Sequence, residues 1–522
     1  MDEAPAVMTR RPGQVFVING DLTKIACDAW MLPTDSRFHV TEAWTDVVSG
    51  LTDDRGCLVG RDWHDTSIGG DGRVQPLEAA KSTDAPRIWL GNIGAVTDDP
   101  VWYTDALHAF VAAAVTDART RAKDRPPRLA VSLIGSGQGG FFARKGALVD
   151  RLVRTAYDAV EEFDVDLVIV TWGSKQYSAL QQARRSLLEE TTQLDPRLKE
   201  QAIRLAAFAR EGQLVLFVGA GASADVGIST WQELLTKLAR DRRFTTNEQA
   251  TLRTLDLRDQ AAIVKRRFDR PADFDAALRP LLASAKYTLV QGLLGSLPVK
   301  EAVTTNFDTL LETAMATAGR TVAVLPAESP QAAERWLLKL HGSLDDETGV
   351  VLSRADYHDL ALRHGALFGL VQALLMTRHM LFVGYSLKDE DFHQLVHEVE
   401  MAGSALRKPF GTTLALFDAP FAQELWNDRL TVVPMLEGQP YEVAHVSTGA
   451  AWLEVFLDYL ACLAADGRDY VLDANYAEML TDDERELHDT LRPLEEFIAI
   501  VKDPALKRQV EAMLAAFGST AE

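Results

Sequence analysis

Residues 214–229 read LVLFVGAGASADVGIS, in which five apolar residues run directly into a glycine-rich turn. This pattern is typical of a buried strand that leads into a helix. Gly219 and Gly221 lack a Cβ atom, so backbone can approach a ligand closely there, and the following helix would offer free N–H groups to an anion. Ser223 adds a hydroxyl. The stretch predicts a pyrophosphate site, although the spacing departs from GxGxxG and a tight turn without a ligand explains the same residues.

Three further polar or glycine-rich clusters follow apolar strands later in the chain. They are carried by VTTNFDTLLE, LLKLHGSLDD and MLFVGYSLKDEDF, at positions Thr305, Asn306, Asp308, His341, Gly384, Tyr385 and Ser386. In an open parallel sheet, ligands bind beyond the carboxyl ends of the strands. A capping residue or a turn explains any one cluster, but four in succession favour a single binding site at one sheet edge.

The chain has 522 residues, too many for one ordinary core. Short apolar runs alternate with helical patterns over most of its length, which predicts an α/β fold with parallel strands. We predict three parts: an α/β domain over residues 1–185, a second α/β domain over 190–450, and a helical tail over 451–522. The tail is expected either to cap the core or to form an oligomer contact.

Composition narrows the class of partner. The formal net charge is −21, which argues against direct binding of nucleic acid or of a membrane surface, because both require basic faces. The N-terminus lacks a leader-like apolar segment and no uninterrupted apolar run approaches 18 residues, so we expect a cytoplasmic protein. The three cysteines, Cys27, Cys57 and Cys462, are too scattered for a disulfide framework or a four-cysteine zinc site.

The motifs GAGAS, TTNFD, LHGS and VGYSLKDEDF, in this order and spacing, resemble the sirtuin superfamily, and most closely the NAD-consuming sirtuin-like domains of bacterial anti-phage defence proteins. The resemblance covers about residues 195–440 and implies a Rossmann-like domain. The NAD-binding residues that it implies are Gly219, Ala220, Gly221, Ser223, Thr305, Asp308, Gly384, Tyr385 and Ser386. The first four would hold the pyrophosphate and the last three would contact the adenosine side.

The same resemblance implies the catalytic residues. Asn306 and Asp308 would hold the nicotinamide ribose, and His341 would act as the catalytic base. Asn306 can hold a water or a ribose hydroxyl without adding charge, and a histidine can accept a proton near neutral pH. For Asp308, an electrostatic and a purely structural role both stay open.

Departures from the protein deacylases of this superfamily bear on the reaction. Those enzymes carry a four-cysteine zinc module, which this chain cannot build, and a Gly-Ile-Pro-Asp-Phe-Arg stretch where this chain has GISTWQEL. Deacylation is therefore disfavoured and attack by water stays open. We expect no metal. His358, His364, His393 and His397 match no motif and are interpreted as surface or packing residues, although the spacing of the last two would suit a helical metal pair.

The N-terminal part resembles macro domains, the α/β modules that bind ADP-ribose, over roughly residues 13–175. The resemblance is carried by VINGDLTKIACDAW and by LAVSLIGSGQGGFFARKG. It implies an adenine contact at Asp21, a phosphate cradle and a ribose-stacking ring, the last two formed by Gly135, Gly137, Gly139, Gly140 and Phe141. An asparagine-rich turn of that family is replaced here by PTDSRF, so binding and a scaffold role both stay open.

Together these features predict an NAD hydrolase that cleaves the nicotinamide–ribose bond, acting as an anti-phage defence effector that depletes NAD on activation. The alternatives are an NAD-dependent ADP-ribosyltransferase or deacylase coupled to an ADP-ribose reader, and a non-catalytic nucleotide-binding regulator. We expect a homo-oligomer whose N-terminal domain receives an ADP-ribose-like ligand or a phage-derived trigger.

Overall fold

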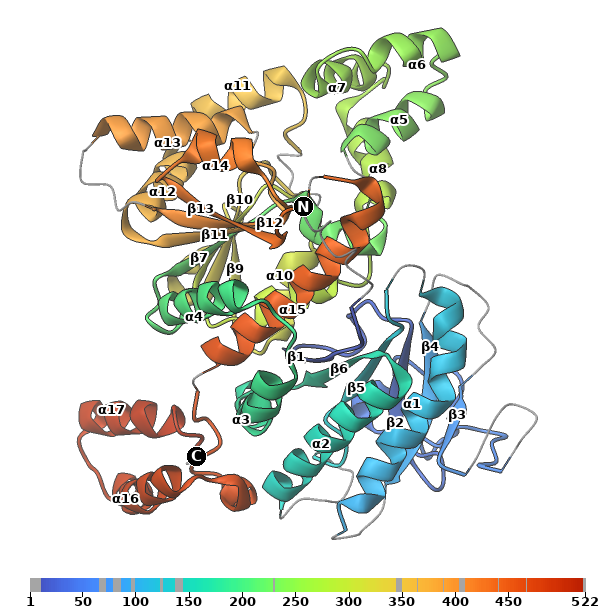
Figure 1. The fold of residues 1–522 in the computed structure, drawn as a ribbon, viewed down its shortest axis with the longest axis vertical. Helices are drawn as coiled ribbons and strands as arrows, with labels where there is room; N and C mark the ends of the chain where they lie inside the picture. The colour runs from blue at the N-terminus through green and yellow to red at the C-terminus, as the bar shows by residue number, and fades with distance from the viewer. Residues whose placement is uncertain are drawn as a thin grey trace, which may run out of the picture. The chain divides into compact units, whose positions relative to one another are not determined.

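The computed structural model describes residues 11–64, 72–77, 86–94, 99–122, 125–136, 144–228, 231–343, 350–363, 365–387, 389–402, 409–439, 441–465 and 467–519. The chain forms two compact units (Figure 1). The first unit comprises residues 1–195 and 450–522, and the second unit comprises residues 196–449. Both are α/β with largely parallel sheets, which confirms the predicted fold class.

The first unit is built on a six-stranded sheet in the order β1-β6-β5-β2-β4-β3. Its strands are β1 (Val15–Asn19), β2 (Ala29–Asp35), β3 (Val74–Pro76), β4 (Arg87–Gly94), β5 (Arg128–Ser132) and β6 (Asp166–Thr171). All neighbours pair in parallel except β3, which runs antiparallel to β4. Parallel strands buried on both faces read as continuous apolar runs, as VFVIN and DLVIVT do here.

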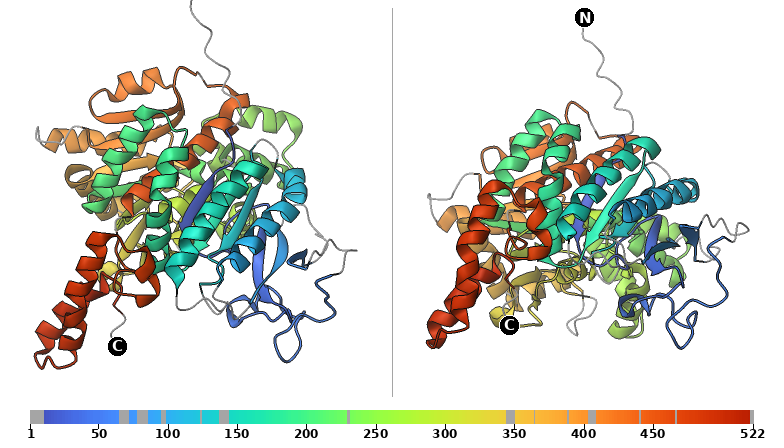
Figure 2. Two further views of the ribbon diagram at one scale, coloured as in Figure 1. Left: turned by 60° about the horizontal axis from the view of Figure 1, so that its bottom comes forward. Right: turned by 90° about the horizontal axis from the view of Figure 1, so that it is seen from below.

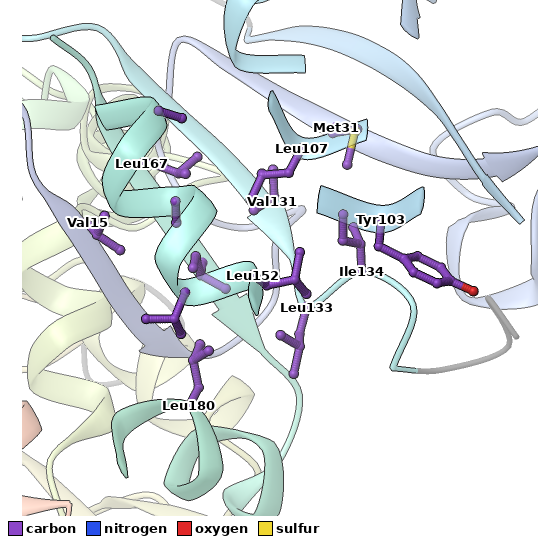
Figure 3. Close-up of a cluster of buried hydrophobic side chains, with 14 of the residues drawn as sticks. Val15, Met31, Tyr103, Leu107, Val131, Leu133, Ile134, Leu152, Leu167 and Leu180 are labelled. Carbon is purple, nitrogen blue, oxygen red and sulfur yellow. The ribbon is translucent and has the colours of Figure 1, made fainter. Parts of the chain in front are cut away.

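Three helices form a layer over this sheet: α1 (Val101–Arg121), α2 (Lys145–Phe163) and α3 (Ser174–Thr191). Figure 2 shows them from two further sides. Their apolar positions meet the alternate strand residues of one sheet face, so that Val15, Val131 and Leu167 pack with Leu152 and Leu180 in one cluster (Figure 3). Each of these side chains is buried, and the cluster is the core of the first unit.

The C-terminal segment is helical, as predicted, and it belongs to the first unit. It contains most of α15 (Val446–Ala464), a 3-10 helix η6 (Ala474–Met479), α16 (Asp482–Ile498) and α17 (Pro504–Ala515). Among the described residues, Val443–Ala464 is the one helical span long and apolar enough to cross a membrane, and 72% of its tested window is buried. Burial within the protein accounts for its apolar character.

Helix α15 covers the open edge of the first sheet with a buried ion pair. Because β1 is an edge strand, its outward backbone groups need partners other than a strand. The Val17 N–H donates to Asp458 Oδ1 (3.2 Å), and the Val15 carbonyl accepts a bond from Arg184 Nη1 (3.1 Å). Arg184 also donates through both terminal nitrogens to Asp458 (2.8 and 2.9 Å), which joins α3 to α15.

A second buried network ties α15 to the N-terminal segment. Arg11 donates to both carboxylate oxygens of Asp166 (2.6 and 2.9 Å), and Arg128 donates to both oxygens of Glu454 (2.7 Å each). All four side chains are almost fully buried. Arg11 also donates to Glu454 Oε2 (3.4 Å), which joins the N-terminal segment to α15, and buried charges are tolerated when they are paired and hydrogen-bonded in this way.

The second unit contains a seven-stranded sheet in the order β13-β12-β11-β7-β8-β10-β9, in which every neighbouring pair is parallel. Its strands are β7 (Leu214–Val218), β8 (Glu301–Thr304), β9 (Val322–Leu325), β10 (Arg335–Lys339), β11 (His379–Val383), β12 (Gly411–Phe417) and β13 (Leu430–Leu436). The chain leaves β7 toward β8 on one side and later returns to β11 on the other. The switch point of this doubly wound sheet therefore lies between β7 and β11.

The helices of the second unit cover this sheet and build a small helical insert. They are α4 (Pro196–Arg210), α5 (Trp231–Asp241), α6 (Thr246–Leu252), α7 (Leu257–Lys265), α8 (Pro271–Leu282), α9 (Leu289–Ser296), α10 (Leu310–Thr317), α11 (Arg354–Arg363), α12 (Gly365–Thr377), α13 (Glu390–Ala402) and α14 (Pro420–Trp426). Helices α5 to α8, green in Figure 1, pack around their own apolar cluster. This insert lies between β7 and β8 in the sequence.

Arg184→Met is expected to destabilise the first unit by about 3–5 kcal/mol, because it leaves the Asp458 carboxylate buried without its cation. Urea denaturation followed by circular dichroism measures the effect. The double variant with Asp458→Leu should recover part of the loss, since it removes both buried charges but also leaves the Val17 N–H and the Val15 carbonyl without these partners. Removal of the exposed Arg154–Asp150 pair should leave the midpoint unchanged. Equal effects of Arg184→Met and of Arg154→Met would contradict the proposed importance of the buried pair.

Candidate functional site at the carboxyl edge of the second sheet

The four motif clusters follow four neighbouring strands. Strands β11, β7, β8 and β10 are adjacent in the sheet and all parallel, so their carboxyl ends meet at one edge. The glycine-rich turn follows β7, Asn306 follows β8, His341 follows β10 and Tyr385 follows β11. The backbone also connects the ends of β8 and β10 at this edge, because the Leu340 N–H donates to the Thr304 carbonyl (2.9 Å).

The glycines after β7 and β11 allow two backbone turns to touch. A Cβ atom on Gly219 would lie 2.6 Å from the Gly384 carbonyl oxygen, and one on Gly384 would lie 2.4 Å from the Ala222 nitrogen. Gly384 also has a φ of +64°, which disfavours any side chain. Two hydrogen bonds join the turns, from Gly219 N–H to Val383 O and from Gly221 N–H to Gly384 O (3.0 Å each). The glycines are therefore required by contact between the turns themselves.

This contact corrects the expectation for the glycine turn. The segment after β7 is a 3-10 helix, η3 (Ala220–Val226), where a regular α-helix was expected. The N–H groups of Gly221 and Ala222 donate to backbone carbonyls of Gly384 and Gly219 and are not available to an anion. Ala220 and Gly221 are exposed, so the outer side of the turn remains accessible.

A single hydroxyl organises the interior of the site. Ser223 is 1% exposed, and its Oγ donates to Asp308 Oδ2 (3.0 Å). The same oxygen accepts bonds from Gln291 Nε2 (2.9 Å) and from Asn306 Nδ2 (3.2 Å). A hydroxyl has one donor and two acceptor sites. Ser223 is thus saturated by protein groups, and its position matches an internal organising role more closely than the pyrophosphate contact that the resemblance implied.

The saturated hydroxyl fixes the orientation of the Asn306 amide. Since Ser223 gives its hydrogen to Asp308, only an amide nitrogen can bond to its oxygen from Asn306. The same Nδ2 donates to the Gly219 carbonyl (3.3 Å), which likewise only accepts. Asn306 is 6% exposed, and its Oδ1 has no hydrogen-bond partner among the described residues. A buried amide oxygen without a partner is costly, which marks it as an acceptor for a bound molecule.

Asp308 is held by groups of the protein. Its carboxylate accepts bonds from Ser223 and, through Oδ1, from the Leu310 N–H (3.1 Å) at the start of α10. Burial raises the pKa of Asp308, opposed by these bonds and by nearby Lys339. The Lys339 ammonium is itself buried and donates to the carbonyls of Phe307 (3.3 Å) and Asp308 (2.7 Å) and to Glu312 (3.1 Å). These contacts favour the structural interpretation of Asp308.

His341 is buried between an acidic and a basic group. It is 6% exposed, its Nε2 lies 3.6 Å from Asp389 Oδ2, and its ring meets Tyr357 edge-on with centroids 5.2 Å apart. Burial lowers the pKa of His341 below its usual value of 6.5; Asp389 opposes this shift and Arg258 adds to it. His341 is therefore neutral at neutral pH, the form in which a base accepts a proton.

The remaining residues expected to bind NAD lie at the same edge. The Tyr385 ring is part of an aromatic cluster, 4.7 Å from the Phe217 ring and 5.7 Å from the Phe392 ring. Ser386 is exposed, and Thr305 is half-buried with its N–H directed to Val218 O (3.4 Å). The ring of Tyr385 thus contributes to packing. The Ser386 hydroxyl is exposed and is more accessible than the Tyr385 side chain.

Sequence reasoning missed four residues of the site. Thr288 and Gln291 form a capping box at the start of α9, and Thr288 Oγ1 donates to the Ala222 carbonyl (2.8 Å). The Thr-x-x-Gln spacing is a readable signal for such a box. Asp389 lies within the motif VGYSLKDEDF, but only the fold shows that it lies beside His341, and Arg258 carries no comparable signal.

Most of the N-terminal ligand prediction cannot be located. Gly137, Gly139, Gly140 and Phe141 lie outside the described residues. Gly135 has a φ of +77°, and a Cβ there would lie 2.7 Å from the Tyr103 ring, so packing alone requires this glycine.

Two further expectations concern Asp21 and metal binding. Asp21 Oδ1 accepts bonds from the N–H (2.8 Å) and hydroxyl (2.7 Å) of Thr23, which forms a local turn. In the part of the chain that the structure describes, no three His, Cys, Asp or Glu side chains are grouped as metal ligands would be.

Gly219→Ala is expected to destabilise the second unit by about 1–3 kcal/mol, because its methyl group would overlap the Gly384 backbone. The matched control is Gly369→Ala in α12, where nothing lies within 4 Å of the new Cβ. The control should be neutral or stabilising by up to about 1 kcal/mol, since alanine is the better helix former. Thermal unfolding of both variants tests the contact, and an unchanged midpoint for Gly219→Ala would refute it.

Comparisons with known proteins agree with this geometry. A family model described as a SIR2-like domain matches residues 300–430, the stretch that contains Asn306, His341 and Gly384. Defense-associated sirtuin 2 of Bacillus subtilis is 26% identical over 260 residues, covering 47% of this chain and 24% of that protein. The NAD(+) hydrolase ThsA of Enterococcus faecium is 26% identical over 208 residues, covering 38% of this chain and 42% of that protein. This chain thus covers less than half the length of either relative.

Among solved structures, a macrodomain of Oceanobacillus iheyensis with ADP covers 35% of this chain and 96% of its own, with a TM-score of 0.27 and 14% sequence identity. The family model and the sirtuin relatives show what part of the second unit is similar to: residues 300–430 match a SIR2-like domain.

Proposed function

We propose that the second unit hydrolyses NAD at the bond between nicotinamide and ribose. The observation that carries this proposal is the buried, unpartnered Oδ1 of Asn306, one strand away from a buried neutral histidine. An acceptor and a base at adjacent strand ends can hold a water or a ribose hydroxyl and take its proton. The SIR2-like family match and the names of the ThsA relatives support NAD as the substrate.

In the proposed reaction, the bond between C1′ of the ribose and the pyridinium nitrogen breaks. The electron pair goes to the nitrogen, so nicotinamide leaves as a neutral molecule and positive charge develops on the ribose. A water oxygen bonds to C1′ and its proton passes to His341, which gives ADP-ribose. The protein must position the water and stabilise the developing cation.

The charges in the site suit this reaction. The Oδ1 atom of Asn306 is the negative end of a fixed amide dipole, so it favours a neighbouring positive charge without the desolvation cost of a carboxylate. His341 is neutral before the reaction and accepts the proton as the water attacks, with Asp389 nearby to stabilise the resulting imidazolium.

We also propose that the protein is a cytoplasmic defence effector that depletes NAD when it is activated. The relative named Defense-associated sirtuin 2 and the NAD(+) hydrolases support this role by similarity. Unrestrained hydrolysis would drain the cell of NAD, so the activity requires a resting state and a signal. A homo-oligomer and an ADP-ribose-like or phage-derived signal at the first unit are part of this proposal.

Asn306→Ala and His341→Ala are each expected to lower NAD cleavage by at least about a hundredfold while the fold survives. The assay incubates purified protein with labelled NAD and follows nicotinamide, ADP-ribose and labelled protein separately. His358→Ala, at an exposed histidine on α11, is the matched control and should keep wild-type turnover. Wild-type turnover in both site variants would show that the assignment is wrong, and label on protein would indicate ADP-ribosyl transfer.

The pH dependence of kcat/KM is expected to follow the two charges beside His341. The rate should fall as the pH drops through the pKa of His341, because the protonated ring cannot act as a base. Asp389→Asn removes the group that raises this pKa, so the acid limb should move to lower pH. Arg258→Met removes a group that lowers it, so the limb should move to higher pH. Shifts of both variants in one direction would contradict His341 as the titrating base.

A further inference from the structure

The loop after β11 contains a buried residue in a strained conformation. Leu387 is 7% exposed and has a φ of +55°, a region that leucine seldom adopts. It lies two residues before Asp389, the carboxylate that faces His341. Such a conformation persists only where surrounding contacts enforce it.

The enforcing contact comes from His393, which sequence analysis interpreted as a packing residue. Its Nε2 lies 2.9 Å from the Leu387 carbonyl oxygen, and because a carbonyl only accepts, this nitrogen must carry the hydrogen. The His393 backbone N–H donates to the Asp389 carbonyl (3.2 Å). This backbone bond is the regular i→i−4 bond at the start of α13, so the contact specific to the His393 side chain is its bond to the Leu387 carbonyl.

The His393 ring is itself fixed. It stacks on Trp426 with centroids 4.8 Å apart and an interplanar angle of 26°. Trp426 is 1% exposed and belongs to the apolar core beneath α13. The orientation of the ring, and with it the direction of its N–H bond, is thus set by the core of the second unit.

We propose that His393 is a positioning residue, which clamps the loop so that Asp389 stays opposite His341. This proposal rests on the proposed function, since it assigns His393 a role in tuning the base of that reaction. Loss of the clamp frees Leu387 to return to an ordinary backbone conformation, which would turn the following residues away. If Asp389 moves away from His341, the effect on the pKa of His341 is the same as when the Asp389 charge is removed. Arg258 and Asp389 are the charged groups that face His341, so the acid limb of the pH profile reports on the loop.

Two variants separate the hydrogen bond from the stacking. His393→Phe keeps an aromatic ring on Trp426 but has no N–H donor, whereas His393→Gln keeps a donor but has no ring. The first should lower kcat by about tenfold with little change in KM and shift the acid limb to lower pH, as Asp389→Asn does. His393→Gln should restore much of the wild-type kcat and of the wild-type position of the acid limb. His397→Ala, one turn further along α13 and exposed, is the control and should match the wild type.

A double-mutant cycle provides the decisive measurement. If His393 acts through Asp389, adding His393→Phe to Asp389→Asn should cause no further shift of the acid limb. Wild-type kcat and pH profile in His393→Phe, additive shifts in the cycle, or equal losses in the Phe and Gln variants would each overturn the clamp. Absence of NAD cleavage by the wild-type protein, both alone and with an added ADP-ribose-like ligand, would refute the proposed function instead. Hydrogen exchange of residues 384–389 in the wild type and in His393→Phe would then test the clamp independently.

Discussion

The contact between the turns after β7 and β11 is the constraint on which the site depends. Gly219 and Gly384 approach so closely that neither position has room for a methyl group. This approach closes the switch point of the sheet and directs the chain after Gly219 into a 3-10 helix rather than along the strand direction. Ser223 reaches the interior of the sheet edge because of that path. Its bonds to the segment after β8 and to Gln291 in α9 then follow.

The hydrogen bonds around Ser223 define the interior of the site. The donor and both acceptor sites of this hydroxyl are used, and within the described part of the chain the Asn306 Oδ1 atom has no partner. A network that is complete except for one acceptor is stiff, since no member can turn without breaking a bond. The buried Lys339 ammonium adds to this stiffness by holding the Phe307 and Asp308 carbonyls, which lie on either side of the Asp308 Cα. The site can thus hold its acceptor in place before any ligand arrives.

Sequence reasoning located the strand ends but could not supply these relationships. Apolar runs and strand-end motifs predict which residues meet at the sheet edge, because the parallel topology makes carboxyl ends coincide. They do not show that the Gly221 N–H donates to the Gly384 carbonyl, since that bond joins residues more than 160 positions apart. Nor do they reveal His393, whose spacing from His397 suggests a metal pair while its actual partners are a carbonyl and an indole ring. The roles of these residues depend on contacts with residues that are distant in the sequence, and a local sequence pattern does not contain that information.

Helix α15 shows the same limit of local sequence patterns, because its pattern suggests a role that its long-range contacts do not support. By length and mean hydropathy, the span Val443–Ala464 passes a test for a membrane-crossing helix. Its two buried carboxylates, Glu454 and Asp458, would be costly in lipid without partners. In the structure each carboxylate meets an arginine of the first unit, and Asp458 also accepts an N–H from the edge strand β1. The apolar surface and the two acids are consistent only with a helix buried in protein, where arginines neutralise the acids and the sheet edge needs an acceptor.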